Sequence, residues 1–145
     1  MSRRRPSGVL WRLLDAEHHE REACLNLMRK CFTKKPEFIA GVNAVILVET
    51  MINLVRRSKI RPSEAAKILW DGFLKSDTRV VIFPIYRSTL EEALTLQRDR
   101  EDVEFPDCVT AATMKENGVS SIYSTNPKHF TFEFVKEAID PRLLT

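Results

Sequence analysis

Apolar residues recur at helical spacing through most of this chain, and short runs of β-branched residues separate the helical stretches. An apolar stripe every three or four residues predicts helices over residues 17–32, 42–57, 62–74, 88–100 and 107–117. Strand-forming runs lie between them, at residues 38–40, 79–85 and 121–123, and residues 130–134 predict a last strand or a turn. This alternation predicts an α/β domain of three layers, with a mostly parallel sheet between helices.

Three of these stretches carry more specific signals. Residues 42–57 are apolar almost all round the helix, which predicts a central position in the fold. The continuous run Val80-Val81-Ile82 is typical of a strand that is buried on both faces. The spacing of Ser88 and Glu91 predicts a capping box at the start of the helix over residues 88–100.

Composition indicates one soluble domain spanning residues 1–145, whose first eight residues are irregular. The chain has 145 residues, a hydrophobic fraction of 43% and a net charge of +3. No uncharged apolar run reaches the roughly 18 residues of a membrane span, and no signal peptide is evident. The odd set Cys24, Cys31 and Cys108 lacks C-x-x-C spacing, so we expect reduced, structural thiols and a cytoplasmic location.

Three polar residues stand where chemistry could be placed. Glu49 lies beside the apolar stripe of the helix over residues 42–57, where a carboxylate is costly unless it is paired or binds a metal. Asp107 opens a helix after Pro106, a position that an ordinary N-cap also explains. Asn126 follows a predicted strand, where turn formation is the simpler explanation. His129 borders the same turn, and alone it is weak evidence for a site.

The order of these motifs resembles the PIN-domain family, and most closely its VapC-type toxin ribonucleases. The resemblance rests on residues 48–57 with Glu49 in mid-helix, on the FPDCVTAA run of residues 105–112, on ENG at residues 116–118 and on IYSTNPKHF at residues 122–130. It implies helices around a parallel sheet and an acidic cluster at the strand ends. That cluster would hold Mg²⁺ or Mn²⁺, because hard divalent cations prefer oxygen ligands, and the ion would activate water to cut an RNA phosphodiester.

By position, the resemblance assigns catalytic roles to Glu49, Asp107 and Asn126. Glu49 and Asp107 would be the metal ligands, and Asn126 would orient a metal-bound water. It also implies an antitoxin partner that covers the acidic site, and a homodimer.

We further expect residues near the site to bind RNA. Ser124 and Thr125 would contact phosphate, and the basic group Arg56, Arg57 and Lys59 would guide the RNA through a salt-dependent attraction.

The front of the chain departs from the family pattern, in which an apolar first strand runs into Asp-x-Asn before a short helix. If the short helix is the apolar run over residues 9–15, the Asp-x-Asn positions read Pro6-Ser7-Gly8. The strand before them then consists of arginines, which do not fit the middle of a parallel sheet. The first strand is therefore predicted to be degenerate or missing and the leading aspartate absent. This favours, as the alternative, an inactive PIN-fold module that binds RNA or a protein; a misassigned start of the chain would also explain it.

Overall fold

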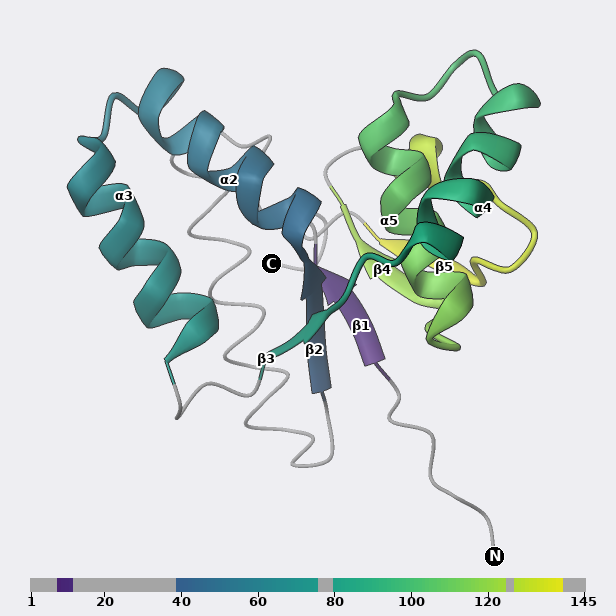
Figure 1. The fold of residues 1–145 in the computed structure, drawn as a ribbon, viewed down its shortest axis with the longest axis horizontal. Helices are drawn as coiled ribbons and strands as arrows, with labels where there is room; N and C mark the ends of the chain where they lie inside the picture. The colour runs from purple at the N-terminus through teal and green to yellow at the C-terminus, as the bar shows by residue number, and fades with distance from the viewer. Residues whose placement is uncertain (1–7, 12–38, 76–79, 125–126, 140–145) are drawn as a thin grey trace, which may run out of the picture.

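The computed structural model describes residues 8–11, 39–75, 80–124 and 127–139. Labels follow Figure 1. The strands are β1 (Gly8–Trp11), β2 (Ile39–Asn43), β3 (Val80–Phe83), β4 (Ser121–Tyr123) and β5 (Glu137–Ile139). The helices are α2 (Ala44–Arg56), α3 (Pro62–Leu69), α4 (Arg87–Arg98) and α5 (Phe105–Glu116). A π-helical turn, η1 (Trp70–Leu74), extends α3, and a 3₁₀ turn, η2 (Pro127–Phe130), follows β4.

The strands form one five-stranded sheet in the order β3-β2-β1-β4-β5, and every neighbouring pair is parallel. The predicted parallel α/β fold is therefore confirmed. The chain moves outward from β1 to β2 and β3, then returns past β1 to form β4 and β5. In such sheets, ligands bind outside the carboxyl ends of the strands where the strand order reverses, which here lies beside β1.

The prediction for the start of the chain was wrong. Val9 was expected to begin a short helix, and the first strand was expected to be degenerate or missing. Instead Gly8–Trp11 is the central strand, which pairs with β2 on one side and with β4 on the other. The apolar run Val9-Leu10-Trp11 suits a strand with neighbours on both sides, and periodicity alone does not separate so short a run from a helix.

Strand β3 forms as predicted, but it is not buried on both faces. It lies at the edge of the sheet, and Val81 and Ile82 are 40% and 37% exposed. The ring of Phe83 packs over Gly41 of β2, where a Cβ atom would lie only 2.1 Å from Phe83 Cε2. A glycine at this position therefore allows close contact between the two strands.

The helices predicted over residues 42–57, 62–74, 88–100 and 107–117 form close to those ranges, with differences at their starts, whereas the helix predicted over residues 17–32 lies outside the described residues. Helix α2 begins at Ala44 because Val42 and Asn43 complete β2. Helix α4 begins at Arg87, and Thr89, rather than the predicted Ser88 and Glu91, closes its first turn by accepting from the backbone N–H of Tyr86. Sequence periodicity shows where such helices lie, but it determines their first residues less accurately.

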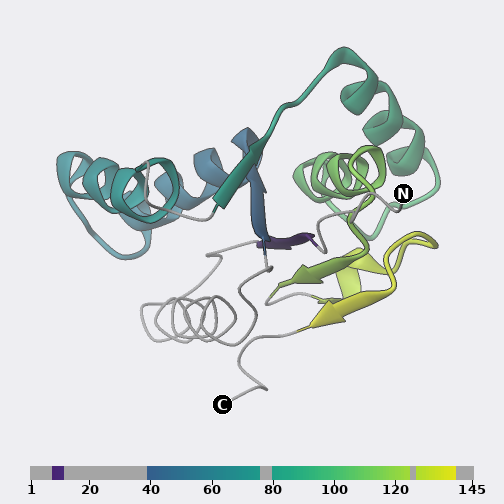
Figure 2. The same ribbon diagram turned by 90° about the horizontal axis from the view of Figure 1, so that it is seen from below.

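The helical hairpin α2–α3 and the pair α4–α5 lie on opposite sides of the central strands (Figure 1), and α2 also contacts α5. Turning the molecule shows β4 and β5 beneath α5 (Figure 2). The core lies between α5 and the sheet, where Val109, Ala112, Ile122 and Phe130 are buried. The arrangement in three layers stays a prediction.

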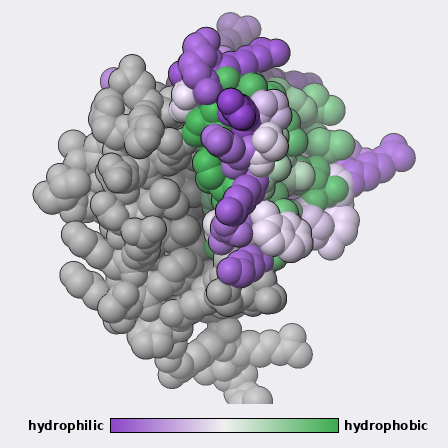
Figure 3. Space-filling view, turned by 90° about the vertical axis from the view of Figure 1, so that its left-hand side faces the viewer, coloured by the Kyte–Doolittle hydropathy of each residue, from purple (hydrophilic) through white to green (hydrophobic). Residues whose placement is uncertain are grey.

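Seen from the side that carries α3, polar and apolar side chains lie next to one another (Figure 3). Hydrophilic side chains form a band over this face, with hydrophobic ones beside it (Figure 3). No helix within the described ranges has the length and apolar character needed to cross a membrane.

Candidate functional site

A buried hydrogen bond joins the two helices that carry the candidate carboxylates. Asn43, the last residue of β2, is completely buried. Its Oδ1 accepts from the N–H of Ile46 at 2.9 Å and so caps α2. Its Nδ2 donates to Thr113 Oγ1 of α5 at 3.0 Å, and Thr113 in turn donates to the carbonyl of Val109 at 2.8 Å. One side chain therefore fixes the start of α2 and its contact with α5.

Glu49 lies in the middle of α2, near its buried stripe. Ile46 and Thr50 are buried on this helix, and Glu49 is separated from Ile46 by about 60° around the axis, at about 100° per residue. The Glu49 side chain is half-buried, and its Oε1 atom is shielded from solvent. The sequence-based expectation of a carboxylate next to the apolar stripe is thus met, while its role is untested.

Asp107 lies in the first turn of α5 and is only 2% exposed. It is not the N-cap, since Glu104 occupies that position. The ordinary explanation of Asp107 as a capping residue therefore fails. The carboxylate is instead buried within the first turn, where the helix dipole favours negative charge.

His129 contacts this buried carboxylate. Its Nδ1 lies 2.8 Å from Asp107 Oδ2, and its side chain is 36% exposed. An ionised carboxylate only accepts hydrogen bonds, so the tautomer with the proton on Nδ1 is the one that donates to it. A buried carboxylate is far less costly when a donor compensates it. The sequence pointed to His129 only as a residue at the edge of the turn.

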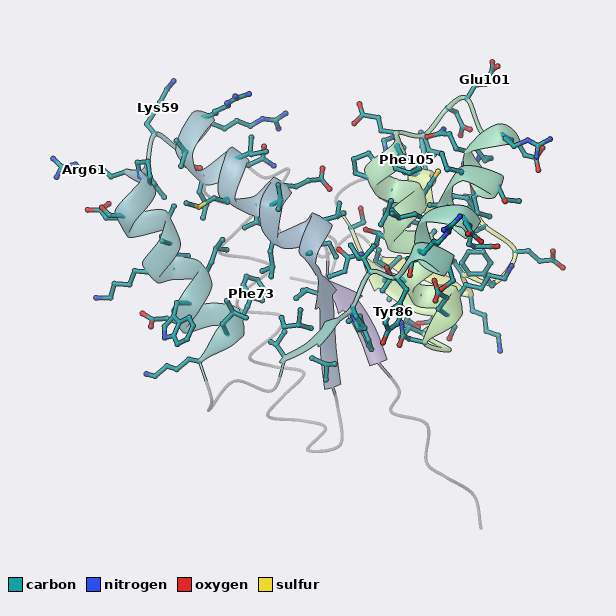
Figure 4. The ribbon with its side chains drawn as sticks, in the orientation of Figure 1. Lys59, Arg61, Phe73, Tyr86, Glu101 and Phe105 are labelled. Atoms are coloured by element: carbon teal, nitrogen blue, oxygen red, sulfur yellow. The ribbon has the colours of Figure 1, made fainter. Side chains whose placement is uncertain are left out.

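The two carboxylates are equally far in sequence from the Asn43–Thr113 bond. Glu49 follows Asn43 along α2, and Asp107 precedes Thr113 along α5, by the same number of residues. At about 1.5 Å per residue, each lies roughly 9 Å along its helix from the Asn43–Thr113 bond. Figure 4 labels Phe105, the first residue of α5 and two residues before Asp107. Glu49 follows the carboxyl end of β2 along α2, the side of the sheet on which the topology predicts a ligand site.

The other predicted site residues near β4 are Ser124, Thr125 and Asn126. Thr125 and Asn126 lie outside the described residues. Ser124 is fully buried, and its backbone N–H donates to the carbonyl of Ile139 at 2.9 Å. A buried hydroxyl does not reach an RNA phosphate at the surface, so Ser124 is better suited to supporting the strand end.

The predicted basic group lies at the far end of α2. Arg56, Arg57 and Lys59 are exposed there, and Lys59 adopts a left-handed backbone conformation with φ 56°. Arg61 extends the group into the start of α3, and Figure 4 shows Lys59 and Arg61 projecting from the tip of the α2–α3 hairpin. The group therefore lies farther from the sheet than Glu49 does.

The described carboxylates suit part of a divalent-cation site. Among the described residues, no cluster of three or more His, Cys, Asp or Glu side chains could hold a metal ion. Glu49 and Asp107 nevertheless each place one carboxylate oxygen in the interior. Mg²⁺ typically uses only one or two protein carboxylates, with water and substrate phosphates as its other ligands. The carboxylate oxygens of Glu49 and Asp107 are of the ligand type that such an ion prefers.

A charged contact beside the site holds the chain after α4. Arg100 pairs with Asp102 at 2.8 Å and also donates to the carbonyl of Thr131, just after η2. The hydrogen bond from Arg100 lowers the pKa of Asp102 to about 2. Burial raises the pKa of the neighbouring Cys108 thiol, which favours its protonated, unreactive form.

Comparison with known proteins decides the family. The pattern that describes the PIN domain matches residues 7–134. The chain belongs to the PIN-domain family. This PIN domain resembles, in fold, the toxin VapC20 of Mycobacterium tuberculosis, described as cleaving the sarcin–ricin loop. The TM-score is 0.58 at 18% identity, over 88% of this chain and 92% of that one.

A second solved structure has a similar fold. It is a toxin–antitoxin complex from Klebsiella pneumoniae, with a TM-score of 0.54 at 12% identity, over 92% of this chain and 97% of the matched chain. A comparison with curated proteins found no match. The sequence-based resemblance to the PIN domain is confirmed, and the relation to VapC toxins is one of fold.

Proposed function

We propose that this PIN domain is a metal-dependent endoribonuclease of the VapC toxin type. The observation that carries the proposal is the placement of Asp107 and Glu49. In a PIN fold, Glu49 and Asp107 each keep one carboxylate oxygen in the interior, and the helices that carry them contact one another. Mg²⁺ or Mn²⁺ would be bound by Glu49 and Asp107. When bound, the ion would provide an activated water and offset charge on the phosphate.

The residues of the chain would supply binding and orientation. Asn126 would orient the water that attacks the RNA, and Thr125 would contact phosphate. Arg56, Arg57 and Lys59 would bind the RNA backbone through its phosphates. Because these cations lie at the tip of the α2–α3 hairpin, they would do so at some distance from the bond that is cleaved. Ser124 is left out of this RNA contact because its side chain is buried.

Cleavage of a structured RNA in the presence of Mn²⁺ tests this function. We expect the wild-type protein to cleave, and Asp107→Asn and Glu49→Gln to lose at least about 100-fold in rate, since each removes a charge from the ion's ligands. Glu104→Gln, an exposed carboxylate in the turn before Asp107, is the matched control and should cleave normally. Equal cleavage by Asp107→Asn and wild type would reject the assignment.

The alternative is an inactive PIN module that binds RNA or a protein without cleaving it. One observation favours it: the residue that follows β1 is Arg12, where the family pattern has an aspartate. The first carboxylate after it in the sequence is Asp15, which lies outside the described residues. If the wild-type protein binds structured RNA but leaves it intact over a Mn²⁺ titration, this alternative replaces the nuclease.

We also propose an antitoxin protein as partner, and a homodimer as the functional form. The likeness in fold to the matched chain of a toxin–antitoxin complex supports the first. An antitoxin helix or arm that covers the acidic site would protect the host cell from cleavage. Expression of the chain with and without the neighbouring gene tests this idea: growth arrest by the wild type, but not by Asp107→Asn, should be relieved by a genuine antitoxin.

A further inference from the structure

We propose that His129 is a positioning residue that holds Asp107 in the orientation needed to bind a divalent cation. The proposal rests on the proposed function, because it concerns the same carboxylate. The geometry consists of the 2.8 Å contact between His129 Nδ1 and Asp107 Oδ2.

The imidazole reaches Asp107 from a well-anchored turn. Phe130, the last residue of η2, is 1% exposed and belongs to the core. Thr131 donates to the carbonyl of Lys128 across the turn, and its own carbonyl accepts from Arg100 at 3.1 Å. The position of His129 is therefore fixed by contacts that do not involve Asp107.

The contact joins a buried carboxylate to a partly exposed imidazole, and this arrangement is suited to orienting the carboxylate. Asp107 is almost completely buried and His129 is about one-third exposed. Burial restricts the carboxylate to a few rotamers, and one hydrogen bond is enough to select between them. Hydrogen bonds of this kind, to carboxylates that bind metals, typically contribute a factor of about 10 to 100 to metal affinity.

A purely structural explanation also exists. The bond could serve only to tie η2 to α5, which are in contact. In that case its loss would lower stability and would affect metal binding only through unfolding. The two roles predict different responses to substitutions of matched shape.

Two variants of the same shape separate these roles. Asn and Leu have nearly the same outline, but only Asn carries an amide nitrogen, Nδ2, as many bonds from the backbone as His Nδ1. His129→Asn can therefore still donate to Asp107, and His129→Leu cannot. Thr131→Val is the control for the turn, because it removes the Thr131–Lys128 bond and leaves the Asp107 contact intact.

The readouts are Mn²⁺ affinity by titration calorimetry and the melting temperature of the metal-free protein. We expect His129→Leu to bind Mn²⁺ about 10- to 100-fold more weakly, while His129→Asn and Thr131→Val stay within about threefold of the wild type. Equal Mn²⁺ affinity for His129→Leu and wild type would overturn the positioning role while leaving the proposed function intact. So would equal losses of affinity in the Asn and Leu variants. A wild-type protein that binds no Mn²⁺ at millimolar concentration rejects both proposals.

Discussion

Asn43 donates a hydrogen bond to Thr113 at 3.0 Å, and both residues are completely buried. The bond spans residues far apart in the chain and joins the helix of Glu49 to the helix of Asp107. Since Asn43 also caps α2, a single side chain links the start of the helix of Glu49 to the helix of Asp107. The site therefore depends on a residue that performs no chemistry itself.

Substitution of Asn43 should weaken both the fold and the site. Asn43→Ala removes an N-cap worth about 0.5–2 kcal/mol and leaves the buried Thr113 hydroxyl without its donor, at a further cost of about 1 kcal/mol. Chemical denaturation should give a total loss of about 1–3 kcal/mol. In a double-mutant cycle with Thr113→Val, the two residues should show a coupling of about 0.5–1.5 kcal/mol. Strictly additive effects would show that the bond contributes nothing.

Glycine substitutions should have opposite effects at two positions. Gly41→Ala places a methyl group 2.1 Å from Phe83 Cε2, so the ring must move, at a cost of about 1–3 kcal/mol. At Gly72 in η1, an added Cβ meets nothing within 4 Å. Gly72→Ala should therefore leave stability unchanged or raise it by up to about 1 kcal/mol. Denaturation curves of the two variants test the close contact between β2 and β3. A Gly41→Ala protein as stable as the wild type would show that this contact is absent.

The carboxyl group of Asp102 should titrate at unusually low pH. Its pKa is lowered from 3.8 to about 2, chiefly by the hydrogen bond from Arg100. A carboxyl group whose pKa is lower in the folded state stabilises the fold at pH values above its ordinary pKa. That stabilisation is lost as the pH falls from about 4 to about 2. Carboxyl chemical shifts measured by NMR should give this value, and Arg100→Gln should return the pKa toward 3.8. An unchanged pKa in that variant would mean that the ion pair does not form in solution.

The basic group should control affinity for RNA rather than cleavage. Replacing Arg56, Arg57 and Lys59 by Gln should weaken RNA binding and reduce the slope of log K against log salt by about 0.7 for each phosphate that the protein no longer neutralises. The metal affinity should stay unchanged, because the group lies at the tip of the α2–α3 hairpin. Arg98→Gln with Lys136→Gln removes two exposed charges elsewhere and is the control. An equal loss of affinity in that control would indicate general rather than local attraction.

The sequence was sufficient for most of the fold because its signals are local. The strand at Ser121–Tyr123 and the helix that contains Asp107 were predicted within two residues. Gly8–Trp11 was mistaken for the start of a helix, since a four-residue apolar strand has too few positions to show a period. The edge position of β3 depends on pairing between distant strands, which no local pattern encodes.

The candidate site was predictable only in part, for a similar reason. Glu49 and Asp107 were named from motif positions. The bond between Asp107 and His129 depends on how η2 packs against α5, so it could not be read from sequence. Asn43 was overlooked, although an asparagine directly before an apolar helix is a recognisable N-cap signal.

The pairing of β1 with two strands determines when the sheet can be completed during synthesis. Val9 lies beside Ala40 on one side and beside Ser121 on the other. While a ribosome is still making the chain, β1 can pair with β2 long before β4 emerges. Because Asp107 and His129 also lie in the later part of the sequence, the contact between them can form only after most of these residues have been made.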